Sequence, residues 1–377
     1  MNVVLLYGGK SGEHEVSLVS AAAVARNLGK AHTLRLISVS KDGCWYLEDE
    51  KYYKELLDNP NAALAVHEVE QNRVCVVPGG GCQKAFAVGN SYIPCDVVFP
   101  VMHGTYSEDG TIQGLFEMAG VPYVGCGVLS SAACMDKETT KVLLQSAGLP
   151  VVPYVCITRA DVNNSALYDA KVEKAVREFG FPLFVKPCSA GSSDGASKAA
   201  NAKELSVALM EAFQWDNKVL IEQAIDAREV ECSVTGNSVT GSPDKAETVL
   251  TAYGPGEIVP KRVFYDYDSK YNDPDAAELK IPADLDTQKI ACIKETAKKA
   301  YAAVNASGLS RVDFFVDRKD GKVYLNEINT LPGFTGISMF PKLCASEGLD
   351  FTRLIDLLFA EAMARFKERS LLRTSRK

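Results

Sequence analysis

Apolar runs alternate with helix-like segments along the first 130 residues. Runs of strand-like length occupy residues 3–7, 34–40 and 97–101, and helical spacing marks residues 13–28 and 110–119. A strand followed by a turn and a helix is the usual opening of an α/β domain. The pattern therefore predicts an open, mostly parallel sheet here, with an irregular stretch over residues 41–81.

Two loops of this region lie at the ends of predicted strands. Residues 8–15 contain glycines, a lysine and two glutamates, and residues 103–110 contain His103, Glu108 and further glycines. In an open parallel sheet, ligands bind beyond the carboxyl ends of the strands. We therefore expect both loops to line one crevice.

Shorter elements follow in the rest of the chain. Helical spacing marks residues 138–147, 166–179, 202–214, 286–305 and 351–367. Strand-like runs occupy residues 154–158, 182–187, 218–222 and 229–236, and residues 254–275 are expected to form a loop. The order and length of the predicted helices and strands change along the chain. These changes predict an α/β and α+β chain of three domains, at residues 1–130, 131–225 and 226–377.

The segment at residues 309–329 predicts a β-hairpin. Its arms alternate in polarity, and residues 319–321 suit a three-residue turn with Gly321 in the left-handed conformation. In that register Asp313 lies opposite Glu327, and Arg311 lies opposite Asn329. Because strand side chains alternate with a period of two, all four share one face.

Two carboxylates, an amide oxygen and a guanidinium on one buried face need partners, since an unpaired buried charge is costly. Magnesium that bridges nucleotide phosphates would bind the oxygens of Asp313, Glu327 and Asn329, and Arg311 would face charge on the reacting group. The alternative is a hairpin whose charges face solvent or pair with one another.

A glycine- and serine-rich loop follows the predicted strand that contains Lys186. Residues 188–195 contain two glycines and three serines, so their backbone N–H groups can approach phosphate oxygens while Lys186 adds positive charge. Glu222 and Glu229 lie near strand ends, where carboxylates could accept hydrogen bonds from adenine and ribose. In isolation these are ordinary turns and ion pairs, but their order along the chain indicates one bound ATP.

Composition narrows the class of protein. The 377-residue chain is 47% hydrophobic and has a formal net charge of −7, which argues against a nucleic-acid partner because phosphate backbones require concentrated positive charge. The only basic cluster, residues 365–377, is expected to be the solvated end of the last helix, without function. We expect eleven unpaired cysteines in a reducing cytoplasm, with Cys188 the candidate for reactivity, and no membrane partner because no long apolar run is visible.

Several motifs occur together, among them Met135-Asp136-Lys137 and Asn326-Glu-Ile-Asn-Thr-Leu-Pro-Gly-Phe334. The others lie at residues 8–17, 103–110, 186–195 and 264–271. With them the whole chain resembles the ATP-grasp superfamily, and specifically the D-alanine–D-alanine ligase family. The resemblance implies an ATP-grasp fold with an N-terminal open parallel-sheet domain. It also implies an enzyme that joins two D-alanines through an acyl phosphate, for peptidoglycan precursors.

The resemblance also implies which residues bind the nucleotide and metal. It gives ATP-binding roles to Lys137, Lys186, Ser193, Glu222 and Glu229. It implies two Mg²⁺ or Mn²⁺ ions, held by Asp313, Glu327 and Asn329.

Substrate-binding roles follow from the same resemblance. Glu13 would bind the ammonium group of the first D-alanine, with His103 beside this substrate. Ser338 and Met339 would receive the carboxylate and methyl group of the second D-alanine.

The resemblance implies a closing device and an oxyanion site as well. Glu13, Ser192 and Tyr271 would form a hydrogen-bonded triad that closes a loop over the site. Arg311 and the backbone N–H of Gly333 would stabilise the tetrahedral oxyanion.

Alternatives concern the acceptor and the class of protein. Relatives that make D-alanyl-D-lactate tend to lack a tyrosine at the position of Tyr271, so Tyr271 favours the dipeptide. A D-alanine–D-lactate or D-alanine–D-serine ligase, and a non-catalytic ATP-binding regulatory module, stay open. Asp194 stands where an apolar residue is usual, and a homodimer is implied by the resemblance alone.

Overall fold

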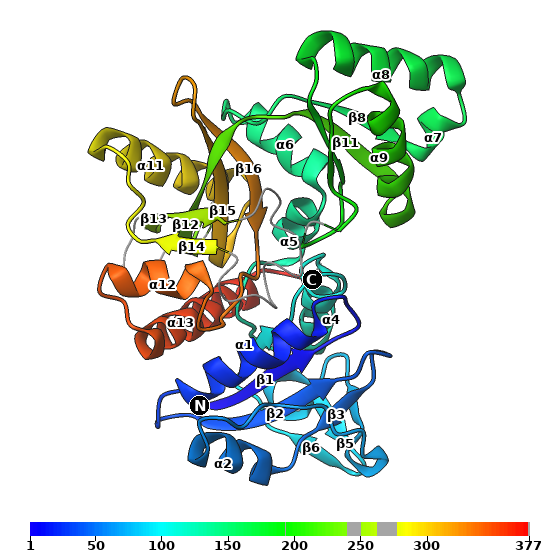
Figure 1. Ribbon diagram of the computed structural model, residues 1–377. Helices are drawn as coiled ribbons and strands as arrows, with labels where there is room; N and C mark the ends of the chain where they lie inside the picture. The colour runs from blue at the N-terminus through cyan, green and yellow to red at the C-terminus, as the bar shows by residue number, and fades with distance from the viewer. Residues whose placement is uncertain (193, 240–249, 262–276, 376–377) are drawn as a thin grey trace.

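Three larger sheets follow one another along the chain (Figure 1). The computed structural model describes residues 1–192, 194–239, 250–261 and 277–375. The division into domains at residues 130 and 225 stays a prediction. Among the described residues, no helix has both the length and the apolar surface needed to cross a bilayer.

The first sheet is the open, mostly parallel sheet that the sequence predicts. Its strand order is β3-β2-β1-β7, and β1 is parallel to both β2 and β7. The strands are β1 (Asn2–Gly8), β2 (Thr33–Val39), β3 (Trp45–Leu47) and β7 (Val97–Val101). The helices α1 (His14–Arg26) and α4 (Thr111–Ala119) follow the two loops of interest.

The prediction of an irregular stretch over residues 41–81 was wrong. This stretch contains β3, α2 (Glu50–Asp58), η1 (Glu70–Asn72) and β4 (Val74–Val76), and α3 (Gly81–Lys84) follows. β4 pairs with β5 (Phe86–Val88), which pairs with β6 (Ser91–Ile93). Three-residue strands are too short to show a period, and tertiary contacts decide them.

The central sheet has the strand order β10-β9-β11-β8, with antiparallel pairs throughout. Its strands are β8 (Tyr154–Thr158), β9 (Leu183–Pro187), β10 (Ser197–Ala199) and β11 (Lys218–Gln223). Its helices are α7 (Arg159–Val162), α8 (Ser165–Phe179) and α9 (Ala202–Trp215). The helices α5 (Val128–Met135) and α6 (Lys137–Ser146) lead into this part from the first sheet.

The third sheet has the order β14-β13-β12-β15-β16. Its strands are β12 (Ala227–Asn237), β13 (Thr251–Pro260), β14 (Ala277–Lys280), β15 (Ser307–Asp317) and β16 (Val323–Asn329). Its helices are α11 (Thr287–Ala303), α12 (Met339–Ser346) and α13 (Phe351–Ser370).

The expected loop over residues 254–275 was wrong at its start, because β13 continues to Pro260. The glycines there serve packing: a Cβ on Gly256 would lie 2.6 Å from Met339 Sδ at the start of α12. Glycine in a strand allows such a close approach. Residues 262–275 lie outside the described residues.

The β15–β16 hairpin keeps the predicted pairing because two register shifts of one residue each cancel. Asp317 N–H donates to Lys322 O, so the loop is residues 318–321 rather than the predicted three-residue turn. Gly321 has φ 71°, the left-handed conformation that was predicted. A bulge then places Asn326 as the extra residue of β16, and beyond it Asp313 pairs with Glu327 as predicted.

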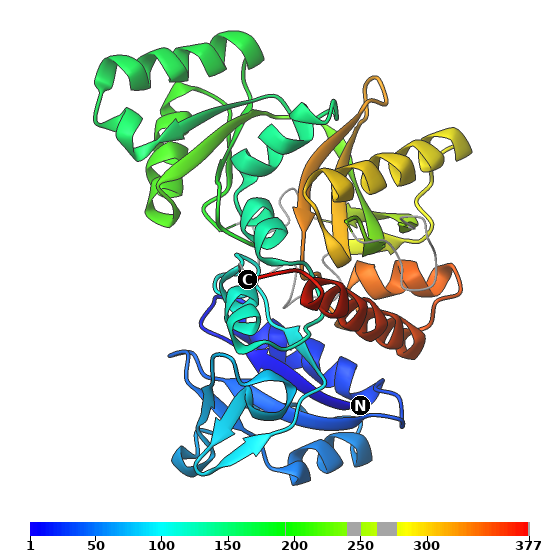
Figure 2. The same ribbon diagram turned by 180° about the vertical axis from the view of Figure 1, so that it is seen from behind.

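The terminal helix α13 lies between the first and third sheets (Figure 2), and its buried residues share one core with β1 and β7. The expectation of a solvated basic end was wrong for Arg365. Its guanidinium donates to Tyr123 O at 2.8 Å, to Ser307 Oγ at 2.7 Å and to Gly125 O, and lies 4.3 Å from the Tyr123 ring centroid.

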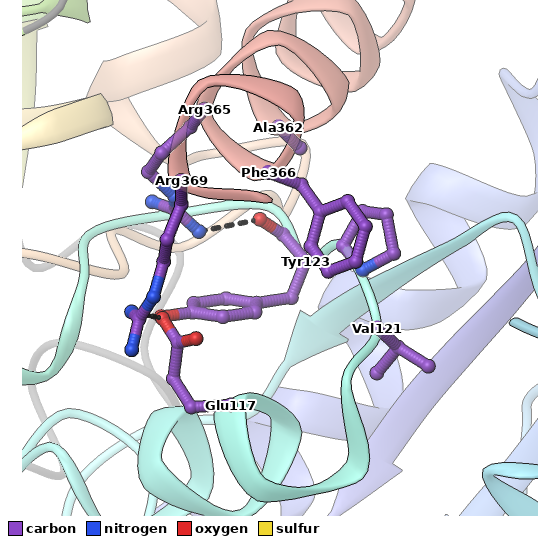
Figure 3. A pocket seen from close by; sticks show the side chains of 8 residues that line it. Glu117, Val121, Tyr123, Ala362, Arg365, Phe366 and Arg369 are labelled. Carbon is purple, nitrogen blue, oxygen red and sulfur yellow. Dashed lines mark hydrogen bonds and ion pairs between the residues drawn. The ribbon is translucent and has the colours of Figure 1, made fainter. Parts of the chain in front are cut away.

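Figure 3 shows the contact between Arg365 and Tyr123. Beside it, Arg369 pairs with Glu117 of α4. The cavity between α13 and residues 117–123 measures about 10 Å³, so it holds at most a water molecule.

The cysteines are unpaired, as expected, since all eleven are free thiols. Cys188 is buried, and the hydrogen bond with Cys156 together with burial raises its pKa far above the ordinary thiol value. A thiol held in its protonated form is a poor nucleophile. Because Cys188 is also shielded from solvent, the structure does not support its candidacy for reactivity.

Candidate functional site

The hairpin face predicted from the sequence is present. Arg311 pairs with Asn329, and Asp313 pairs with Glu327. The Arg311 guanidinium donates two 2.7 Å hydrogen bonds to the two oxygens of Asp313, and its Nε lies 3.1 Å from Glu231 Oε2 on β12. Burial disfavours the charged guanidinium, but Asp313 and Glu231 outweigh it and raise the pKa of Arg311 further.

The donors on this face suit a magnesium ion that carries phosphates. Asp313, Glu327 and Asn329 offer hard oxygen atoms, the type of ligand that Mg²⁺ prefers. Within the described part of the chain, no three His, Cys, Asp or Glu side chains form a group that could hold a metal alone. The residues therefore fit a metal whose remaining ligands come from a nucleotide and water, and their metal role stays a prediction.

Two predicted nucleotide lysines reach this face from the central part. Lys186 Nζ on β9 lies 3.0 Å from Asn326 Oδ1, the bulge residue. Lys137 Nζ at the start of α6 lies 3.9 Å from Glu327 Oε2 and donates to Ala190 O of the glycine-rich loop at 2.7 Å. Both cations thus lie beside the hairpin, and their role in binding phosphate stays a prediction.

The sequence predicts Glu222 as an adenine ligand, but in the structure both of its carboxylate oxygens contact lysines. Its Oε1 lies 2.8 Å from Lys141 Nζ, and its Oε2 lies 2.9 Å from Lys186 Nζ. Burial alone would raise the pKa of Glu222, but the two lysines lower it, so the carboxylate is ionised. Glu229 lies on the same strand as Glu231, two residues away, and Ser193 lies outside the described residues. The nucleotide roles of Glu222, Glu229 and Ser193 stay predictions.

Two members of the predicted triad are in contact. Ser192 Oγ donates a 2.6 Å hydrogen bond to Glu13 Oε1, which joins the glycine-rich loop to the start of α1. Tyr271 lies outside the described residues.

The two loops of the first sheet are in contact, and the crevice expected between them stays a prediction. Ser11 Oγ donates to His103 O at 2.7 Å and accepts from Glu13 N–H at 3.1 Å. A Cβ on Gly104 would lie 2.9 Å from Glu13 Oε2. Gly104 also has φ 73°, so both its backbone and its surroundings require glycine.

His103 is buried between these loops and the segment after β16. Its Nδ1 lies 3.2 Å from Leu331 O and 3.8 Å from Glu108 Oε1, and its Nε2 lies 3.3 Å from Ser20 Oγ. Burial opposes the imidazolium, but the nearby carboxylates of Glu108 and Glu13 raise the pKa of His103. Burial raises the pKa of Glu108 as well.

Gly333 and Ser338 lie near His103, because Ser20 contacts both His103 and the residue after Gly333. A Cβ on Gly333 would lie 2.8 Å from Ser338 Oγ, and the neighbouring N–H of Phe334 donates to Ser20 Oγ at 3.4 Å. Ser338 Oγ accepts from Thr335 N–H at 3.0 Å. Met339 is buried in the core beside Gly256. The substrate roles of Ser338 and Met339 stay predictions.

Three charged residues of the site had no predicted role: Glu108, Lys141 and Glu231. Lys141 follows Lys137 by four residues, which places both on one face of a helix. Glu231 follows Glu229 by two, which places both on one face of a strand. The helical and strand periods could therefore have identified Lys141 and Glu231. No such period indicates the contact of Glu108 with His103.

Comparisons with known proteins agree on one family. The family model described as the D-ala D-ala ligase N-terminus matches residues 2–126, and the D-ala D-ala ligase C-terminus matches residues 143–360. The D-alanine–D-alanine ligase of Treponema denticola is 51% identical over 376 residues, which cover 100% of both chains. That of Proteus mirabilis is 42% identical, over 99% of this chain and 98% of its own.

Solved structures give the same answer. The D-alanine–D-alanine ligase from Coxiella burnetii superposes with a TM-score of 0.80 at 32% identity, covering 98% of this chain and 96% of that one. The VanG D-Ala:D-Ser ligase from Enterococcus faecalis has a TM-score of 0.78 at 34% identity, covering 96% and 99%.

The fold is accordingly the ATP-grasp fold that the resemblance implied. The chain belongs to the D-alanine–D-alanine ligase family.

Proposed function

We propose that this chain uses ATP to join two D-alanine molecules into D-alanyl-D-alanine, for peptidoglycan precursors. The observation that carries the proposal, in a chain of this family, is that Lys137 joins the loop that contacts Glu13 to the hairpin face of Arg311, Asp313 and Glu327. Its Nζ donates to Ala190 O, two residues before Ser192, and lies 3.9 Å from Glu327 Oε2. These groups come from all three parts of the sequence, and each supplies a charge or hydrogen bond that the reaction needs.

Lys137 and Lys186 would hold the phosphates of ATP, with backbone N–H groups of the glycine-rich loop. Ser193, Glu222 and Glu229 complete the proposed nucleotide site. Asp313, Glu327 and Asn329 would hold two Mg²⁺ ions, which neutralise phosphate charge when bound.

A carboxylate is a poor electrophile, so its phosphorylation supplies a leaving group. The carboxylate oxygen of the first D-alanine attacks the γ-phosphorus of ATP, and ADP leaves. The amine of the second D-alanine then attacks the acyl carbon, and phosphate leaves after a tetrahedral oxyanion has formed. Arg311 and the Gly333 N–H would stabilise this oxyanion, since fixed donors act where charge develops.

The proposed substrate contacts divide between two sites. Glu13 would pair with the ammonium group of the first D-alanine, beside His103. Ser338 and Met339 would receive the second. Closure of the Glu13–Ser192–Tyr271 triad would keep water from the acyl phosphate.

A second candidate is a D-alanine–D-serine ligase, because one structural relative carries that name. Product analysis separates the two. With ATP and D-alanine alone, we expect ADP, phosphate and D-alanyl-D-alanine in equal amounts, whereas added D-serine or D-lactate should yield only minor mixed products. A dominant mixed product would favour the second candidate, and ATP binding without ADP formation would favour a regulatory module.

We also propose the cytoplasm as the site of the reaction and a homodimer as the assembly. ATP as the phosphate donor and eleven free cysteines support the cytoplasm. Light scattering at working concentrations tests the dimer: a monomer mass would refute it.

A further inference from the structure

Lys141 is a fully buried lysine to which the reaction outlined above gives no task. It lies on α6, one turn after Lys137, and its side chain is 0% exposed. Its Nζ lies 2.8 Å from Glu222 Oε1, 3.4 Å from Val152 O and 5.5 Å from the centroid of the Tyr154 ring. Burial lowers the pKa of Lys141, and the negative charge of Glu222 opposes that shift.

Lys141 belongs to a row of contacting polar side chains that ends at the hairpin. The row consists of Lys141, Glu222, Lys186 and Asn326. Glu222 gives one oxygen to Lys141 and the other to Lys186, and Lys186 continues to Asn326 Oδ1 at 3.0 Å. The Glu222 carboxylate therefore contacts two lysines, and Lys141, Glu222 and Lys186 together carry one net positive charge. Lys186 lies near the end of β9, directly before the glycine-rich loop.

The geometry points to Lys141 as a positioning residue for the nucleotide: Lys141 keeps Glu222 compensated, so that Lys186 is free to leave this carboxylate for the phosphates of ATP. The inference rests on the proposed function, because it takes Lys186 to be a phosphate ligand. Glu222 and Asn326 hold Lys186 beside the proposed nucleotide site, at 2.9 and 3.0 Å.

The role follows from the cost of a lone buried charge. Without Lys141, movement of Lys186 to a phosphate would leave the Glu222 carboxylate buried and uncompensated, which is strongly unfavourable. Lys186 would then stay on Glu222, and phosphates would have to compete for it. Removing the charge of Glu222 as well should release Lys186 again.

The chain offers a matched control in Lys171. Its Nζ lies 2.6 Å from Asp161 Oδ2, so it too forms a lysine–carboxylate pair in the central part. Lys171 is on α8 and 31% exposed, and its pair shares no residue with the row from Lys141 to Asn326.

The test measures Mg–ADP affinity of the full chain by calorimetry in five forms: wild type, K141M, K171M, E222Q and K141M/E222Q. We expect K141M to weaken binding about ten- to a hundredfold in the wild-type background, but to change binding by less than about threefold in the E222Q background. K171M should bind as the wild type does. A purely structural role would make K141M weaken binding as much in the E222Q background as in the wild type.

Two results overturn the inference: K141M that binds as K171M does, or K141M that weakens binding as strongly in the E222Q background as in the wild type. If K141M fails to fold by circular dichroism, E222Q and K141M/E222Q are compared, because neither keeps the Glu222 carboxylate. Equal affinity supports the inference, and weaker binding by the double variant refutes it. A wild type that binds no Mg–ADP refutes the proposed function itself.

Discussion

Ser192 Oγ donates a 2.6 Å hydrogen bond to Glu13 Oε1 across 179 positions of the sequence. The bond ties the glycine-rich loop after β9 to the start of α1. A substrate ammonium beside Glu13 and a phosphate beside the loop would therefore be held in one fixed geometry.

Removal of this bond should loosen the first substrate site. Hydrogen bonds to charged groups contribute about 1.5–3 kcal/mol, so we expect S192A to lower kcat/KM for D-alanine about ten- to a hundredfold. Initial rates of ADP release over a range of D-alanine concentrations measure it. S189A changes an exposed serine of the same loop and should leave the rates unchanged; equal loss in both variants would contradict a specific role.

Arg311 should be needed for chemistry rather than for folding alone. R311K keeps a positive charge but loses the two-pronged contact with Asp313. We expect kcat to fall about 10²-fold, the scale for loss of one oxyanion donor. R228K is the matched control, because Arg228 forms the same two-pronged contact with Glu257, at 2.7 and 2.6 Å, on β12. A kcat for R228K as low as that for R311K would contradict the assignment.

The pair of Glu257 and Arg228 gives a prediction for stability against pH. The hydrogen bond from Arg228 lowers the pKa of Glu257 below its ordinary value of 4.5. Its stabilisation is thus present above pH 4.5 and lost as the pH falls through the lower, folded-state pKa. We expect E257Q to reduce the free energy of unfolding by about 2 kcal/mol at pH 7, and by progressively less below pH 4.5.

Urea unfolding at several pH values measures this difference. E278Q removes the charge of an exposed glutamate on β14 and should show little difference at any pH. A difference for E257Q that persists unchanged at pH 3 would refute the ion-pair explanation.

The terminal helix should hold the first sheet through Arg365. R365M removes donors to three oxygens, so we expect the free energy of unfolding to fall by about 2–4 kcal/mol. The urea midpoint measures it, with R373A, an exposed arginine of the same end, as the control. Equal midpoints would restore the expectation of a solvated tail.

The sequence was most informative where a period was long enough to count. The alternation along β15 and β16 predicted that Asp313 and Glu327 share one face, and the run before Lys186 predicted β9. The larger loop and the bulge at Asn326 stayed hidden, because each shifts the register by one residue and the two shifts cancel at the site.

Long-range partners could not be predicted in the same way. Nothing near Arg365 in the sequence indicates that its partners lie at Tyr123 and Gly125. The sharing of Glu222 between two lysines likewise depends on how α6 and β9 lie relative to β11. Contacts between distant segments follow from the packing of the whole chain.

The central claim is that this chain phosphorylates the carboxylate of D-alanine before it forms the peptide bond. D-alanine labelled with ¹⁸O in its carboxylate tests this most directly, with mass spectrometry of the released phosphate. The account predicts one ¹⁸O atom in each phosphate and one dipeptide per ADP, with neither formed by E327Q. Phosphate without label, or ADP released at the same rate without D-alanine, would contradict it.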